Sequence, residues 1–245
     1  MARYKLTLEY DGTSFTGWQI QAKDATVQGV LIQALARING SPVIVQGAGR
    51  TDSGVHALGQ VAHVDMQNAW DGFELRNAIN AGVRPHKVSV LAVEAVGEDF
   101  NARFSATRRH YLYRILNRRS PPTMDLGQVW FVPVTLDADA MHGAAQVLVG
   151  HHDFSTFRAS ECQAATPLRT LDQLDVARYG DFIEVRASSR SFLHNQVRSM
   201  VGSLKYVGEG KWQAKDLQNA LEAKDRRACG VVAPPEGLYL TRVDY

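Results

Sequence analysis

The feature that most constrains the fold is an order of secondary-structure elements that occurs twice in the chain. Residues 4–96 read as strand, helix, strand, strand, helix and strand, and the same order returns over residues 110–245. Strands are indicated by apolar residues at every second position, and helices by apolar residues three and four apart. Two βαββαβ units of the split βαβ, or ferredoxin-like, type account for this order.

The first half has clear boundaries. Alternating apolar residues predict a strand over residues 4–10, and the sequence Asp11-Gly12 ends it with a turn. A helix is predicted from Val27 to Asn39, closed by Gly40 as a C-terminal cap. Short strands follow at residues 42–47 and 58–66, then a helix over 71–83 with Asp71 as N-cap, and a strand over 87–96.

The second half repeats the order with insertions. We expect a strand at 110–116, a helix from Asp137 to Val149 capped by Gly150, and a hairpin over 169–188 turning near Gly180. A helix carrying Leu193, with a neighbouring polar stripe at residues 194, 195 and 198, is followed by a helix at 214–223 and a strand at 237–245.

We therefore predict an α+β fold with two ferredoxin-like halves, residues 1–105 and 106–245. Sheets of this type are antiparallel and carry their helices on one face, which leaves the other face able to contact a large ligand. The halves are expected to pack side by side, because no flexible linker separates them.

Composition narrows the class of protein. With 245 residues, 45% of them hydrophobic, the chain is ordinary for a globular protein. It has no signal-peptide pattern and no apolar run of about 18 residues, so we expect a cytoplasmic protein without a membrane span. Cys162 and Cys229 are far apart and are expected to be free thiols. The net charge of +2 says little about nucleic acid, but arginines are clustered, as at Arg108 and Arg109.

The stretch "GAGRTDSGVHALGQVAHVD", residues 47–65, concentrates chargeable groups between two predicted strands. We expect Asp52 to lie on a loop shaped by neighbouring glycines, with Arg50 able to pair with it and keep it ionised. An ionised carboxylate is a nucleophile or a base at neutral pH. It is not a proton donor.

Other interpretations of this stretch are weaker. A phosphate-binding loop or a dinucleotide fingerprint would open a helix, whereas a strand follows here. A triad of Asp52, Ser53 and His56 is improbable for adjacent residues, and His56, His63 and Asp65 are too few convergent ligands for a metal. From the residues alone, an Asx-type turn with no catalytic role remains an alternative interpretation of the stretch.

Six motifs together resemble the tRNA pseudouridine synthase A family. They are "YDGTSFTGWQIQ" at 10–21, "VQGVLIQAL" at 27–35, "GAGRTDSGVHA" at 47–57, "FSATRRHYLYRI" at 104–115, "DFSTFRAS" at 153–160 and "FLHNQVRSMVG" at 192–202. The resemblance implies two ferredoxin-like halves around a central RNA-binding cleft and a homodimer. It also implies isomerisation of uridines 38, 39 and 40 of the tRNA anticodon stem-loop, without metal or cofactor. Residues 117–128 and 208–216 match weakly.

The same resemblance implies roles for particular residues. Asp52 matches the nucleophile, and Arg50 matches the arginine beside it. Tyr111 matches the tyrosine that contacts the uracil ring, whereas Tyr113 is expected in the core. The arginine that pairs with the nucleophile matches Arg198, with Arg190 as a competitor.

Substrate contacts and alternative functions follow from the charged residues. Arg108 and Arg109 are expected to contact tRNA phosphates. A non-catalytic RNA-binding protein is the main alternative, although it has no use for a desolvated carboxylate at Asp52 among phosphates. A phosphotransferase would need a magnesium-binding acidic cluster, which the sequence does not suggest.

Overall fold

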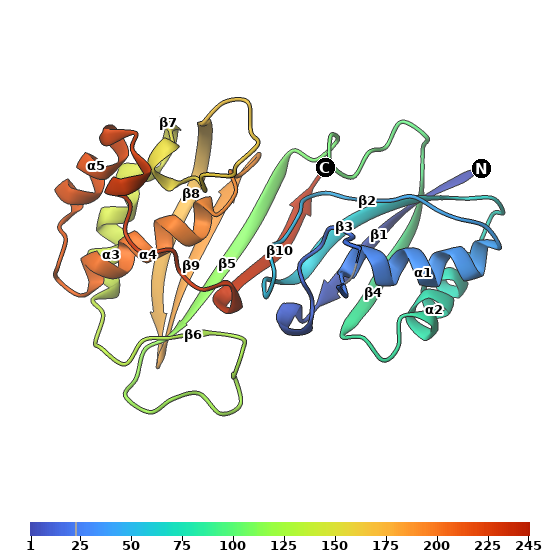
Figure 1. Ribbon diagram of the computed structural model, residues 1–245, viewed down its shortest axis with the longest axis horizontal. Helices are drawn as coiled ribbons and strands as arrows, with labels where there is room; N and C mark the ends of the chain where they lie inside the picture. Colours follow the sequence, from blue (N-terminus) through green and yellow to red (C-terminus); the bar gives the residue numbers. More distant parts are fainter. Residues whose placement is uncertain (23) are drawn as a thin grey trace. The chain divides into compact units, whose positions relative to one another are not determined.

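The computed structural model describes residues 1–22 and 24–245 and has an α+β fold. The chain forms two compact units (Figure 1). Unit 1 contains Met1–Thr107 and Tyr239–Tyr245, and unit 2 contains Arg108–Leu238. The C-terminal segment thus lies in the unit built from the beginning of the chain, although the order of elements assigns it to the second half of the sequence.

The sheet of unit 1 explains why the C-terminal segment belongs there. The strands β1 (Ala2–Tyr10), β3 (His56–Met66) and β4 (Val88–Val96) pair in the order β4-β1-β3, all antiparallel. The short strand β2 (Val45–Gly47) pairs antiparallel with one end of β3, and β10 (Leu238–Asp244) pairs in parallel with the other end. Tyr239 lies opposite His56 in that parallel pair.

Two helices pack together with the sheet of unit 1, as predicted. The helix α1 (Val27–Asn39) begins after Thr26, whose side chain accepts a hydrogen bond from the Gly29 N–H, and ends at Gly40, with φ of 71°. The helix α2 (Gly72–Gly82) begins after Asp71, whose carboxylate accepts bonds from two N–H groups of the first turn. Local capping residues define both ends of α1 and the start of α2, which is why these boundaries are readable from sequence.

Unit 2 has an antiparallel sheet in the order β5-β9-β8-β7. Its strands are β5 (Arg108–Leu116), β7 (Gly150–Asp153), β8 (Leu168–Tyr179) and β9 (Phe182–Ser189). The two-residue strand β6 (Trp130–Phe131) pairs in parallel with β5. The hairpin between β8 and β9 turns at Gly180, as predicted, where φ is 59°.

The helices of unit 2 gather beside β8 and β9 (Figure 1). They are α3 (Ala138–Ala145), α4 (Gln196–Gly208) and α5 (Ala214–Ala223). Four 3₁₀ turns accompany them in the described part of unit 2, at Gln146–Leu148, Ser155–Phe157, Arg226–Ala228 and Pro235–Gly237.

Two predictions for unit 2 were wrong. The helix expected to reach Val149 ends at Ala145, and Gly150, with φ of 116°, begins β7 instead of capping a helix. The pairing of Gly150 with Leu171 of β8 explains this, because a partner 21 positions away overrides the local helical pattern. The polar stripe at residues 194, 195 and 198 is also not helical throughout, because α4 begins only at Gln196.

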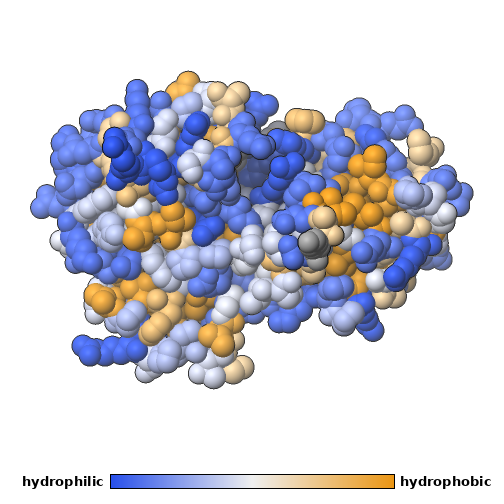
Figure 2. Space-filling model, viewed as in Figure 1, coloured by the Kyte–Doolittle hydropathy of each residue, from blue (hydrophilic) through white to orange (hydrophobic). Residues whose placement is uncertain are grey.

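Hydrophilic residues cover most of the face shown in Figure 2, and apolar residues lie in several separate groups on it. Across residues 1–22 and 24–245, no helix is long and apolar enough to cross a bilayer.

Candidate active site

The loop that carries Asp52 connects β2 to β3 in unit 1. Asp52 is half-buried, and the preceding Thr51 is buried. The N–H of Val55 donates to the carbonyl of Asp52 at 3.1 Å, which closes a turn, and Gly54 in that turn has φ of 78°. A positive φ favours glycine, so the loop needs this residue to return the chain into β3.

The segment from Tyr10 to Trp18 holds this loop in place. The hydroxyls of Tyr10 and Thr51 are 2.8 Å apart, and the N–H of Trp18 donates to the carbonyl of Thr51 at 3.0 Å. A Cβ added to Gly12 would collide with the carbonyl oxygen of Val55, so the two segments approach through their backbones. The position of Asp52 is therefore determined by backbone contacts and a buried tyrosine on the neighbouring segment.

Ser53 and His56 are structural supports of the loop. The hydroxyl of Ser53 donates to the carbonyl of Phe15 at 3.3 Å. The Nδ1 atom of His56 accepts a bond from the N–H of Gly12 at 3.0 Å, and its ring stacks on Tyr239 with centroids 4.7 Å apart. Because Nδ1 accepts from Gly12, it does not donate a bond to Asp52 as the Nδ1–H of a triad histidine would.

The remaining polar side chains of the stretch have structural partners. His63 accepts a bond from the N–H of Ala102 at 3.1 Å, and Asp65 makes a two-bond ion pair with Arg3. The Arg3 guanidinium holds the pKa of the Asp65 carboxyl below its usual value. In the described part of the chain, no three His, Cys, Asp or Glu side chains are grouped as metal ligands.

Arg50 does not pair with Asp52. Its side chain is exposed and makes no hydrogen bond or ion pair with any residue of 1–22 or 24–245. The two motif residues therefore lie on one loop without an ion pair between them.

Tyr111 and Tyr113 occupy different environments on β5 in unit 2. Tyr111 is half-buried, and its ring meets Phe192 edge-on with centroids 5.2 Å apart. Tyr113 is fully buried, and its hydroxyl donates to the carbonyl of Pro234 at 2.7 Å. Burial raises the pKa of Tyr113 well above its usual value. The prediction that Tyr113 belongs to the core is confirmed, and Tyr111 retains a ring that is partly accessible.

Arg198 is held rigidly on the first turn of α4. Its Nε donates to the carbonyl of Ala233 at 2.7 Å, and its Nη1 donates to the Asn195 side-chain oxygen at 2.9 Å. Asn195 adopts φ of 61° just before the helix, so it reaches Arg198 from outside the helix rather than along a helical stripe. Arg190, the competitor, has an exposed side chain.

The predicted phosphate contacts Arg108 and Arg109 lie at the start of β5. The Nε of Arg108 forms an ion pair with Asp172 at 3.0 Å, which offsets much of its charge. The Nη1 of Arg109 donates to the carbonyl of Arg190 at 2.7 Å, a contact that orients the side chain.

Sequence reasoning missed the residues that hold the Asp52 loop. Gln60 is fully buried, and its Nε2 donates to the carbonyl of Gly49 at 2.9 Å. Tyr10 was assigned only to a strand face, although its hydroxyl contacts the loop. The motif at residues 10–21 was the signal that pointed to this segment, because the whole motif resembles the family.

Residues 7–105 and 144–245 match the family model described as tRNA pseudouridine synthase. The chain belongs to that family, whose members are isomerases.

Relatives agree over the full length of the chain. A tRNA pseudouridine synthase A from Beijerinckia indica is 64% identical over 245 residues, covering 100% of this chain and 94% of the relative. Proteins with the same name from Xanthobacter autotrophicus and Rhodopseudomonas palustris are 62% and 61% identical, each with 100% of both chains covered.

Proposed function

We propose that the protein converts uridine to pseudouridine at positions 38, 39 and 40 of the tRNA anticodon stem-loop, with Asp52 as the nucleophile. The observation that carries the proposal is the loop itself. The family match spans the loop, and the described contacts of Thr51 and Gly54 give the half-buried Asp52 a defined position.

The reaction suits a carboxylate. Conversion breaks the bond from N1 of uracil to C1′ of ribose, rotates the base and joins C5 to C1′. No atom is gained or lost, so no redox partner or nucleoside triphosphate is required. Asp52 can attack C1′, add to C6 of the ring, or remove a ribose proton to give a glycal, and the proposal holds for each of these routes.

Tyr111 and Arg198 have supporting roles in the proposal. The partly accessible ring of Tyr111 offers a surface for an unstacked uracil, the usual way in which proteins hold a flipped base. Arg198 is the better candidate than Arg190 to orient the carboxylate, because two hydrogen bonds fix its guanidinium before substrate binds. Arg50, Arg108 and Arg109 are proposed to contact the RNA, and Arg108 would exchange its ion pair with Asp172 for a phosphate.

The wider organisation is also proposed. Within unit 1, the order β4-β1-β3 with β2 on the far side of β3 supports a ferredoxin-like half. Within unit 2, the antiparallel order β5-β9-β8 supports a second one. We further propose two halves with boundaries near residue 105, a homodimer, and action in the cytoplasm.

The function is tested by mapping pseudouridine in total tRNA from cells with and without the gene, and in transcribed tRNA treated with the purified protein. Pseudouridine at positions 38–40 that disappears without the gene, and forms on the transcript, is the expected result. Unchanged maps in both experiments contradict the proposal. Tight tRNA binding without turnover would instead identify a non-catalytic RNA-binding protein.

A further inference from the structure

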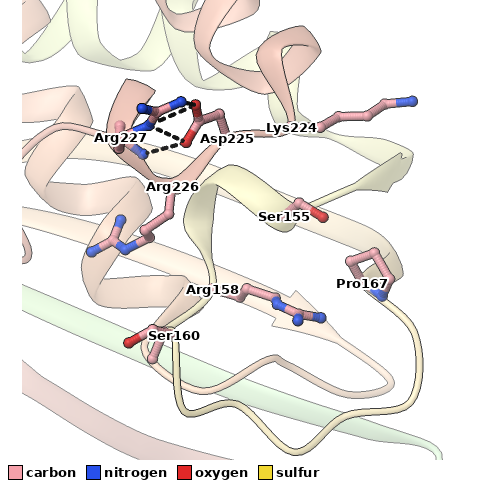
Figure 3. Close-up of a pocket in the computed structure, with 9 residues that line it drawn as sticks. Ser155, Arg158, Ser160, Pro167, Lys224, Asp225, Arg226 and Arg227 are labelled. Carbon is pink, nitrogen blue, oxygen red and sulfur yellow. Dashed lines mark hydrogen bonds and ion pairs between the residues drawn. The ribbon is translucent and has the colours of Figure 1, made fainter.

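A basic pocket lies in unit 2, and none of the proposed catalytic residues lines it. Its volume is about 720 Å³, and four basic side chains with a single carboxylate are found among the residues that line it (Figure 3). These charged residues are Arg158, Lys224, Asp225, Arg226 and Arg227.

The carboxylate does not neutralise the pocket. Asp225 forms hydrogen bonds and an ion pair with Arg227, the shortest at 2.7 Å, so each of these two charges is offset by the other. The side chains of Arg158 and Lys224 make no hydrogen bond or ion pair with any group in the described ranges 1–22 and 24–245. Two cationic groups are therefore available to an anion from solution.

The available groups are arranged as a phosphate needs them. Figure 3 shows the Arg158 and Lys224 side chains extending to the same side of the pocket, with the Ser155 hydroxyl between them. A planar guanidinium and an ammonium are donors that phosphate oxygens accept from, whereas the Ser155 hydroxyl already donates to the Asp153 carboxylate. Burial raises the pKa of the nearby Asp153 carboxyl, but hydrogen bonds from the hydroxyl and N–H of Ser155, with smaller contributions from the charges of Lys224 and Arg158, hold it below its usual value.

The walls of the pocket are preorganised. The fully buried Thr156 donates through its hydroxyl to the carbonyl of Ala220 at 2.6 Å and accepts from the N–H of Asp225 at 3.1 Å. The Nη1 of Arg226 donates to the carbonyl of Thr156 at 3.2 Å. These bonds join the 3₁₀ turn after β7 to the segment after α5, so the two walls keep their separation without a ligand.

Lys224 occupies a position that favours glycine. It ends α5 with φ of 50°, in the left-handed region, where a side chain strains the backbone. A glycine would remove that strain, and it would also remove the ammonium from the pocket.

A hydrogen bond also connects the pocket to the segment just before α4, the helix that carries Arg198. The N–H of Ala159 donates to the carbonyl of His194 at 2.9 Å, directly before the turn that positions Arg198. We propose that this pocket binds a backbone phosphodiester of the substrate tRNA. The proposal rests on the proposed function for the identity of the RNA.

The test compares matched lysine variants in equilibrium tRNA binding at several salt concentrations. Lys224→Ala removes a cation that lines the pocket, whereas Lys215→Ala removes an exposed lysine from α5 that does not line it. We expect Lys224→Ala to weaken binding several-fold and to reduce the slope of log K against log salt by about 0.7–0.9, the value for one lost phosphate contact. Lys215→Ala is expected to match the wild type.

Arg158 provides a second comparison. Arg158→Ala is expected to behave like Lys224→Ala, while Arg158→Lys retains the charge and most of the salt slope. Melting temperatures check that each variant is folded. At saturating tRNA, kcat should be retained and KM should rise. An unchanged salt slope in both alanine variants, or an equal loss in Lys215→Ala, would overturn the proposal.

Inorganic phosphate distinguishes an RNA phosphate from a free one. It is titrated at constant ionic strength against the wild type and the Arg158→Ala/Lys224→Ala double variant. A rise in melting temperature for the wild type alone, together with equal tRNA salt slopes, would assign the pocket to free phosphate and overturn the RNA contact. If the wild type forms no pseudouridine, the proposed function fails while the binding curves still decide on the pocket.

Discussion

The Asp52 loop and the basic pocket around Arg158 differ in what the surrounding hydrogen bonds hold in place. Around Asp52, hydrogen bonds from Trp18 and Tyr10 are made to the neighbouring Thr51, so the surroundings determine the path of the backbone. Around Arg158, buried bonds of Thr156 shape the walls, and the side chains of Arg158 and Lys224 extend without hydrogen-bond or ion-pair partners among the described residues. Bond-making at one carbon needs an accurately placed atom, whereas phosphate binding needs charge within reach of an ion.

The largest expected effect is the loss of turnover in Asp52→Asn. The amide has nearly the same shape and cannot act as a nucleophile or base, so we expect kcat to fall by about 1000-fold or more, roughly 4 kcal/mol in the activation free energy. Single-turnover pseudouridine assays measure the rate, and filter binding checks that tRNA affinity is largely kept. Ser53→Ala is the control in the same loop, because Ser53 only supports Phe15. Turnover in Asp52→Asn close to the wild-type rate would remove Asp52 from the chemistry.

The second prediction tests whether backbone fit positions the Asp52 loop. In Gly12→Ala the new Cβ meets the Val55 carbonyl, so the two segments must separate, at a cost of about 1–3 kcal/mol in the free energy of unfolding. We expect a lower melting temperature together with a reduced kcat, because the shift reaches the turn after Asp52.

Gly49→Ala is the matched control for that variant. In the part of the chain that the structure describes, a Cβ at Gly49 would have no neighbour within 4 Å, although Gly49 lies in the same loop. Its stability should stay within about 0.5 kcal/mol of the wild type. Equal losses in Gly12→Ala and Gly49→Ala would show that the loop tolerates no side chain anywhere, and the specific contact with Val55 would then not be the cause.

Whether a feature depends on neighbouring or on distant residues explains which parts of the fold could be predicted from the sequence. The boundaries of α1 and the start of α2 were predicted because Gly40 and Asp71 act on their own helix ends. The true end of α3 and the place of β10 were not, because they depend on pairing with distant strands such as β8 and β3. Periodicity identifies a strand and carries no information about its partner.

In the candidate site, too, features that depend on residues distant in the sequence were not predicted. Asp52 became a candidate because glycines and polar residues surround it within a few positions, and its role as nucleophile came from the family resemblance and stays a prediction. The contact of Tyr10 with Thr51 spans 41 positions, and the pocket joins Arg158 to a lysine 66 positions further on, so neither has a local signal. The family resemblance supplied the motif at 10–21 without indicating what its residues touch.

The third prediction asks whether Tyr111 acts through its ring. Tyr111→Ala should raise the KM for tRNA and lower kcat, with a combined cost of about 1–3 kcal/mol, the range for one base stacked on an aromatic side chain. Tyr111→Phe retains the ring and its edge-on contact with Phe192, so its activity should stay near that of the wild type. Steady-state kinetics on one transcript separates the two variants. Equal losses in both would point to the hydroxyl and count against stacking.

The smallest expected effect concerns the buried hydroxyl of Tyr10, which contacts Thr51 and, at 3.4 Å, the Nε2 of Gln60. Tyr10→Phe leaves both partners with one bond fewer, and we expect a loss of about 1 kcal/mol in the free energy of unfolding near pH 8. Tyr179→Phe, at an exposed position, should change the free energy of unfolding little. Urea unfolding of the three proteins measures these differences.

The pH dependence of the Tyr10→Phe difference gives the sharper test. Burial raises the pKa of Tyr10 to about 12, against hydrogen bonds from Thr51 and Gln60 that lower it. Because the folded-state pKa lies above the unfolded value of about 10, the stabilisation is complete below pH 10 and is lost as the pH rises toward 12. At about pH 11 the wild type should have lost about 1.4 kcal/mol more than Tyr10→Phe, so its advantage should vanish. A difference between the two proteins that stays constant from pH 8 to 11 would mean that Tyr10 titrates as it does in the unfolded chain.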